Sequence, residues 1–156
     1  RMDVNMKKIL FFTVLLVVIA CNKNTKENEE PPICCSPPPF FRLFIAKSAP
    51  EYQDFLNNKG EGDRDNVYFY QIVEDGTEKK YLTTLSTDIP KNKEYALVAM
   101  VDGIILYTGK IETLYLKNKT KTYKIEFLGT IGECCSAHFQ EMYIDGIKNN
   151  DFILVK

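Results

Sequence analysis

Residues 67–86 read VYFYQIVEDGTEKKYLTTLS, and this stretch decides the fold class that we expect. Aromatic and β-branched side chains recur in its two arms, Val67–Val73 and Lys80–Ser86, as is typical of β-strands. The four residues between the arms, 74–77, read EDGT and favour a tight turn because Asp-Gly tolerates positive φ. The stretch therefore predicts a β-hairpin.

Strand-like runs of the same kind recur along the chain. We expect further strands at Phe40–Ala46, Tyr95–Val101, Ile104–Thr108, Lys110–Leu116, Thr122–Leu128, Cys135–Ile144 and Phe152–Val155. Asp102-Gly103, between two of these runs, is the strongest two-residue hairpin signal. One short helix is expected near Pro50–Asn57, capped by Ser48. Many short strands with tight turns predict an all-β fold, an antiparallel β-sandwich or partly open barrel of about eight strands.

A short apolar run near the N-terminus has the features of a signal peptide. Lys7 and Lys8 precede the run Ile9–Ala20, and Cys21 follows it. A run of about 12 residues is too short to span a bilayer, which takes roughly 20. We therefore expect residues 1–20 to be removed as a signal. Residues 1–5 precede a complete-looking start at Met6, so we expect them to lie outside the true reading start.

The end of this run, Val18-Ile19-Ala20-Cys21, resembles the lipobox of bacterial lipoproteins. The resemblance implies cleavage after Ala20, attachment of diacylglycerol to the Cys21 thiol and acylation of the new amino group, with palmitate as an expected acyl chain. In such lipoproteins an aspartate directly after the cysteine favours retention in the inner membrane. Asn22 occupies that position, so the resemblance implies a lipid anchor in the outer membrane, on its periplasmic or cell-surface face.

Residues 21–33 are expected to form the lipidated cysteine and a flexible tether, followed by a β-sandwich domain at 34–156. The segment 22–32 contains no apolar residue apart from prolines, so it buries too little to offset its ordering entropy. Its acidic residues Glu27, Glu29 and Glu30 loosely resemble the surface-export signals of Bacteroidetes lipoproteins, but they lie further from the cysteine and are less compact. A solvated linker is the favoured interpretation.

The charge balance of the mature part argues against a nucleic-acid partner. From Cys21 onward there are 17 Lys and Arg against 20 Asp and Glu. Nucleic-acid binding needs a concentrated basic face, which a formal charge near −3 does not indicate. About 136 residues is enough for one domain with a real core.

Four cysteines remain after Cys21, in two adjacent pairs at the start and near the end of the domain: Cys34-Cys35 and Cys134-Cys135. An even number of cysteines in an exported chain favours disulfides. The alternative is a tetra-cysteine zinc site, but such sites usually place two to four residues between the members of a pair. We therefore expect disulfides and neither a metal nor a cofactor.

His138, the one histidine of the chain, is the residue on which any catalytic hypothesis depends. A lone histidine in a predicted strand more often faces solvent or a hydrogen-bond partner than takes part in catalysis. We therefore predict no catalytic residue. The alternative is an envelope hydrolase, or an inhibitor of one, that uses His138 with nearby carboxylates such as Glu133 or Glu141.

Two further binding hypotheses have simpler structural explanations. The loop Gly60–Asn66 gathers oxygen ligands suited to calcium, yet it lacks the pattern of an EF-hand and contains Arg64, so a solvated loop is favoured. The nine tyrosines could contribute a sugar-stacking surface, but core packing and cross-strand pairing explain most of them.

The order of these features is similar to that of a group of small uncharacterised Bacteroidetes lipoproteins. The similarity rests on the lipobox, the polar and proline-containing tether, the early cysteine pair and the late segment Gly132–Ser136, which is followed by Phe139 and an Asp145-Gly146 turn. It implies an envelope β-sandwich and no particular activity. We therefore expect a non-catalytic binding or accessory module, attached to the membrane through its lipid, with an unknown protein, glycan or small ligand as its partner.

We predict at least one disulfide between the early and the late cysteine pair. A bond between neighbouring cysteines needs a distorted peptide, whereas a bond between the pairs meets ordinary geometry. Closing a loop of about 100 residues contributes up to about 4.7 kcal/mol in the chain-entropy model. Peptide mapping under non-reducing conditions should recover a cross-linked peptide that joins Cys34 or Cys35 to Cys134 or Cys135. Four free thiols, or bonds within pairs alone, would contradict the prediction.

Overall fold

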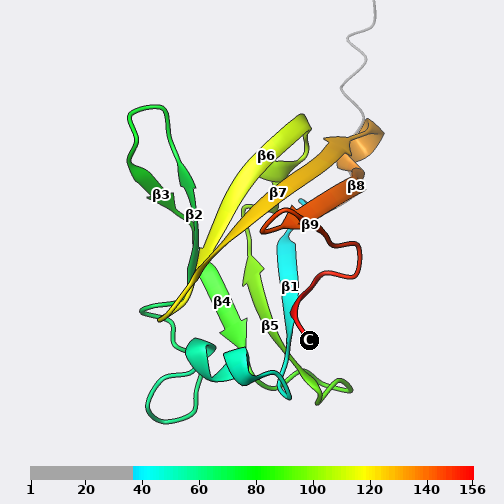
Figure 1. The fold of residues 1–156 in the computed structure, drawn as a ribbon. Coiled ribbons are helices and arrows are strands. Elements are labelled where there is room, and N and C mark those ends of the chain that lie inside the picture. Colours follow the sequence, from blue (N-terminus) through cyan, green and yellow to red (C-terminus); the bar gives the residue numbers. More distant parts are fainter. Residues whose placement is uncertain (1–36) are drawn as a thin grey trace, which may run out of the picture. The chain divides into compact units, whose positions relative to one another are not determined.

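The structure is a computed structural model that describes residues 37–156 (Figure 1). The predicted signal peptide, Ala20, Cys21, the tether, Cys34 and Cys35 lie outside the described residues, as does the side chain of Cys135. The described strands are β1 (Phe41–Ala46), β2 (Tyr68–Ile72), β3 (Glu78–Lys80), β4 (Thr83–Ser86), β5 (Tyr95–Met100), β6 (Thr108–Lys117), β7 (Thr122–Ile131), β8 (Ala137–Ile144), β9 (Ile147–Lys148) and β10 (Ile153–Val155). Three short 3₁₀ helices join them: η1 (Pro50–Phe55), η2 (Gly103–Leu106) and η3 (Glu133–Cys135).

These strands form two sheets, which confirms the predicted all-β sandwich. The smaller sheet has the order β10-β1-β5-β4, and the larger has the order β3-β2-β6-β7-β8-β9. The long β6–β7 hairpin runs through the middle of the larger sheet (Figure 1). The strand pairs are antiparallel, as predicted, with the one addition of a parallel pair between β1 and β10. The last strand lies beside the first and runs in the same direction.

The core lies between the two sheets because side chains alternate along each strand. On β1, Phe41, Leu43 and Ile45 are buried, whereas Arg42 is exposed and Phe44 is partly exposed. The ring of Phe41 contacts Phe69 of β2 and Phe127 of β7, with centroid separations of 5.6 and 5.7 Å. Phe41 therefore links the smaller sheet to two strands of the larger one.

The hairpin predicted for residues 67–86 is confirmed in its first part. Strands β2 and β3 pair around the turn, in which Gly76 has a φ of +83° and the Asp75 carboxylate accepts hydrogen bonds from Thr77. The second arm, however, divides into β3 and β4, which belong to different sheets. Tyr81 lies at the crossing, is buried and donates its hydroxyl proton to Gln71 Oε1 at 2.7 Å.

The prediction of a hairpin at Asp102-Gly103 was wrong. Strand β5 belongs to the smaller sheet and β6 to the larger, so residues 101–107 cross between the sheets. Neither Asp102 nor Gly103 has positive φ, as the tightest hairpin turns require. Gly103 serves a close approach instead, because a Cβ there would lie 2.5 Å from the Phe41 nitrogen. Leu106, which follows in η2, is fully buried and helps to close that end of the core.

Two smaller expectations also differ from the structure. The helix expected at residues 50–57 is the 3₁₀ helix η1, and its N-cap is Ala49, without a side-chain hydrogen bond, in place of Ser48. The strand expected from Cys135 begins at Ala137 because the preceding residues form η3. Within residues 37–156, none of the helices has the length and apolar character needed to cross a bilayer.

The alternation on β1 predicts opposite outcomes for two neighbouring phenylalanines. Phe41→Ala removes a fully buried ring between the sheets and should lower the free energy of unfolding by about 3–5 kcal/mol. Phe40→Ala, the matched control at a half-exposed position, should change it by less than about 0.5 kcal/mol. Chemical denaturation of both variants measures the difference, and equal losses would show that the register of β1 is wrong.

Candidate functional site

The late cysteine pair lies in a turn and not in a strand. Cys134 has a φ of +52° and a ψ of +36°, a left-handed conformation that non-glycine residues rarely adopt. Its side chain is exposed and has no disulfide partner among the described residues. The partners that we predict for the pair lie outside those residues, so the disulfide stays a prediction.

His138 is exposed at the start of β8, beside the η3 turn. Its Nε2 lies 3.1 Å from the Ser136 hydroxyl oxygen. Gly132 leaves room for this contact, since a Cβ there would lie 2.8 Å from Ser136 Oγ and 2.9 Å from Nε2. The Ser136 hydroxyl also donates to the Glu133 carbonyl oxygen at 2.9 Å. A hydroxyl has one proton, so while Ser136 donates to the Glu133 carbonyl, its contact with Nε2 is a hydrogen bond only in the tautomer that carries the imidazole proton on Nε2.

No carboxylate completes this pair within the part of the chain that the structure describes. The ion pairs there are Lys121–Asp145, Lys124–Glu126 and Lys156–Asp151, and none includes His138. Glu141, one of the carboxylates that the hydrolase hypothesis requires, accepts a hydrogen bond from the Tyr143 hydroxyl at 3.4 Å. Glu133 enters the contact through its backbone carbonyl. The geometry brings together a histidine and a hydroxyl but no third group that would orient the imidazole.

The loop that gathers oxygen ligands, Gly60–Asn66, satisfies its central carboxylate internally. Asp63 is only 6% exposed, so the interpretation of a fully solvated loop does not hold at this residue. Its two carboxylate oxygens accept hydrogen bonds of 3.1 and 2.9 Å from the Asn66 amide group, and one also accepts the Asn66 backbone N–H. These hydrogen bonds hold the pKa of Asp63 below its ordinary value. Residues 37–156 contain no cluster of three or more His, Cys, Asp or Glu side chains suited to a metal ion.

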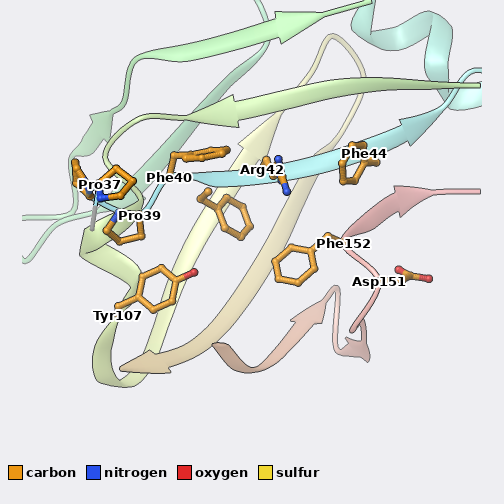
Figure 2. Close-up of a pocket in the computed structure, with 10 residues that line it drawn as sticks. Pro37, Pro39, Phe40, Arg42, Phe44, Tyr107, Asp151 and Phe152 are labelled. Atoms are coloured by element: carbon orange, nitrogen blue, oxygen red, sulfur yellow. The ribbon is translucent and has the colours of Figure 1, made fainter. Parts of the chain in front are cut away.

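An apolar groove of about 460 Å³ runs along β1 (Figure 2). One end is formed by Pro37, Pro38 and Pro39, where the described chain begins. Tyr107 and Phe152 line the opposite wall, and the ring of Phe152 lies toward β1. Burial raises the pKa of the Tyr107 hydroxyl above its ordinary value.

Arg42 provides the positive charge of this groove. Its guanidinium lies between two aromatic rings of the same strand, 5.3 Å from the Phe40 centroid and 5.7 Å from the Phe44 centroid. The nearest acidic side chain of the groove, Asp151, is paired with Lys156 at 2.6 Å. Arg42 is exposed, and it has no ion pair among the side chains that the structure describes.

The groove borders a larger apolar surface on the outward side of the smaller sheet. Arg42 and Phe44 pair with Ala99 and Leu97 of β5, which in turn pair with Thr84 and Ser86 of β4. One position beyond the strand ends, the same pattern aligns three exposed side chains, Phe40, Val101 and Leu82. We use the name apolar face for this surface, which consists of Phe40, Arg42, Phe44, Leu82, Thr84, Ser86, Tyr95, Leu97, Ala99 and Val101. Arg42 is its single charged residue.

The outward side of the larger sheet has a different character. Tyr70 pairs with Lys80 and with Tyr115, and Tyr115 pairs with Lys124, so a Lys-Tyr-Tyr-Lys row crosses four strands. The Tyr70 and Tyr115 rings are stacked at 5.1 Å. Beside them, the Lys80 ammonium lies 4.1 Å from the centroid of the Tyr68 ring. We call these five residues the tyrosine face.

Neither surface was identified from the sequence. The number of tyrosines suggests a possible stacking surface, but which tyrosines share one side of the sheet depends on how the strands pair. The apolar face had a signal that was not used: Tyr95–Met100 reads YALVAM, which is apolar at every position and so predicts a strand whose two faces both prefer to be covered.

Comparisons with protein-family models, with curated proteins and with solved structures found no match to this chain.

The Asp63 hydrogen bonds predict a specific loss of stability in acid. A carboxyl group whose pKa is lowered by folding contributes stability above its ordinary pKa of about 4, and this is lost as the pH falls through the lowered value. Urea unfolding at pH values from neutral to about 3 should therefore show a shallower decline for Asp63→Asn than for wild type. Asp65→Asn, at an exposed neighbour, is the control and should keep the wild-type slope. Equal slopes for wild type and Asp63→Asn would contradict this assignment.

Proposed function

We propose that this protein is a bacterial envelope lipoprotein, anchored through lipid on Cys21 in the outer membrane, whose β-sandwich is a non-catalytic binding or accessory module. The observation that carries the proposal is the lipobox-like Val18–Cys21, placed after a basic and apolar leader. Several acyl chains on one residue give stable anchoring, whereas a single chain binds a membrane marginally. The sandwich begins shortly after a polar tether and is thereby held near the bilayer.

One feature of the sandwich supports a binding role. On the tyrosine face the partly exposed rings of Tyr68 and Tyr115 lie beside lysine side chains, a combination that suits the ring faces of a glycan or the side chains of a protein. Tyr70 is buried and stacks against the Tyr115 ring. The partner that we propose is a protein or a glycan, and it approaches this face. A formal charge near −3 for the mature chain gives no support for a nucleic-acid partner.

The geometry around His138 supports a role without catalysis. General base catalysis needs an imidazole that accepts a proton from a positioned nucleophile and is oriented by a third group. His138 is exposed, and the Ser136 hydroxyl beside it donates to the Glu133 carbonyl. The lining of the groove along β1 does not include His138.

One observation favours a second candidate function. The distance of 3.1 Å between Ser136 Oγ and His138 Nε2 is within hydrogen-bond reach, as a hydrolase with a serine nucleophile would require. Rotation of the hydroxyl toward Nε2 would convert the contact into a nucleophile–base pair. In that case the protein would be an envelope hydrolase that acts on a substrate at the η3 turn.

We predict that anchoring is essential and the histidine dispensable. Cys21→Ser prevents acylation, so the protein should leave the membrane fraction and lose any phenotype of the gene. His138→Ala and Ser136→Ala, at exposed and partly exposed positions, should keep wild-type localisation, stability and phenotype. The measurements are mass spectrometry of the membrane-extracted N-terminus and complementation of a deletion strain.

Two outcomes would reject parts of the proposal separately. An unmodified Cys21, or an intact segment 6–20, in cells with a working lipoprotein pathway would reject the anchor. Loss of a measurable turnover in a folded and anchored His138→Ala variant would replace the binding module with the hydrolase.

A further inference from the structure

We propose that the apolar face lies on the phospholipid bilayer to which the chain is anchored, with Phe40 and Leu82 in the headgroup–acyl boundary and Arg42 at headgroup phosphates. The inference rests on the proposed lipid anchor at Cys21 and adds an orientation of the domain. It assigns the smaller sheet to the membrane and leaves the tyrosine face toward the aqueous side.

This surface exposes large apolar side chains at one end of the smaller sheet. Phe40 is 54% exposed, Leu82 71% and Val101 59%, and each lies one position beyond the paired ends of β1, β4 and β5, where Phe41 and Thr83 both pair with Met100. Single exposed apolar residues are ordinary, but a contiguous row marks a surface that contacts a partner or a membrane. Most other outward positions of this sheet are also apolar, including Leu97 and Phe44.

The position of the tether identifies the bilayer as the occupant. The described chain begins at Pro37, which lines the groove next to Phe40, and Cys21 lies only sixteen positions earlier. A flexible chain of that length has a root-mean-square reach of roughly 20–24 Å. A domain of about 120 residues has a radius of gyration near 14 Å, and hence a diameter larger than this reach. The end of the domain that carries Phe40 is therefore the end held against the membrane.

The charges of the two sheets favour the same orientation. Arg42 is the one charged residue of the apolar face, and its guanidinium has no described partner, so it is free to bind a phosphate in the bidentate manner that arginine favours. The rings of Phe40 and Phe44 on either side of it provide apolar surface at the same depth. The opposite sheet carries Lys80, Lys124 and Glu126 on its outward side, and these side chains need water.

The absence of tryptophan from the sequence makes the proposal directly testable. The mature, acylated chain is reconstituted into vesicles of phosphatidylethanolamine and phosphatidylglycerol, with Phe40→Trp as the only tryptophan. We expect a blue-shifted emission compared with the same variant in non-ionic detergent, and a loss of emission when the lipids carry brominated acyl chains. Leu82→Trp is a second reporter in case the first change disturbs the fold. Tyr115→Trp, on the tyrosine face, is the matched control and should show neither effect.

The role of Arg42 has its own comparison. In the Phe40→Trp chain, Arg42→Gln should reduce quenching by brominated lipids in vesicles that contain phosphatidylglycerol. In vesicles of phosphatidylcholine alone, which present no net negative charge, the change should have a smaller effect. An Arg42→Gln variant with undiminished quenching in both vesicle types would remove Arg42 from the proposal.

The failure of this inference is distinguishable from failure of the lipid anchor. Flotation with the vesicles and the acyl mass on Cys21 are measured first, and their absence would reject the anchor. A chain that is acylated and floats, but whose Phe40→Trp and Leu82→Trp emission matches that of Tyr115→Trp, would overturn the membrane-facing orientation alone. A blue shift that is insensitive to bromination and disappears when the protein is diluted in the lipid would also overturn it, because a second copy would then cover the face.

Discussion

The packing of Phe41 against Phe69 and Phe127 is the interaction on which the rest of the structure depends. These edge-to-face contacts join β1 of the smaller sheet to β2 and β7 of the larger one. Aromatic rings in such contacts contribute beyond the area that they bury. The contact orients β1. Successive side chains of a strand point to opposite sides, so the alternate side chains point away from the core when Phe41 points into it. Phe40, Arg42 and Phe44 are outward for this reason, so the packing of Phe41 in the core determines which residues of this segment belong to the apolar face.

The element types could be predicted from local sequence, but their assignment to sheets could not. Two Asp-Gly pairs illustrate the difference. At Asp145-Gly146 both residues have positive φ and the flanking strands β8 and β9 pair as a hairpin. At Asp102-Gly103 the same dipeptide joins strands of different sheets, because Leu106, which follows in η2, is buried at the end of the core. Local turn preference is worth less than the burial of Leu106, and tertiary packing determined the outcome.

The candidate surfaces were missed for a related reason. The sequence indicates that Tyr95–Met100 is apolar at every position, and such strands are typical of sheets that are covered on both sides. Whether a second layer covers the outward side depends on the number and placement of the other elements, which strand-by-strand reasoning does not supply. The tyrosine face has the same dependence, since Tyr70 and Tyr115 are 45 residues apart and meet only through the register of β2 with β6. By contrast, the exposure of His138 was expected from the sequence because a lone polar side chain has little reason to be buried.

Anchoring through a short tether lowers the membrane affinity that an apolar surface needs in order to stay on the bilayer. A free domain with one exposed apolar face would have to find a membrane from solution, and a few side chains give little affinity for it. The attachment that we propose at Cys21 would make the second contact intramolecular, so that the local concentration of the bilayer near Phe40 would be high without further binding energy. The face then needs only to favour one orientation over others, and an apolar sheet with a single arginine meets that requirement. In the orientation that we propose, the opposite sheet, with its stacked Tyr70 and Tyr115, lies away from the lipid.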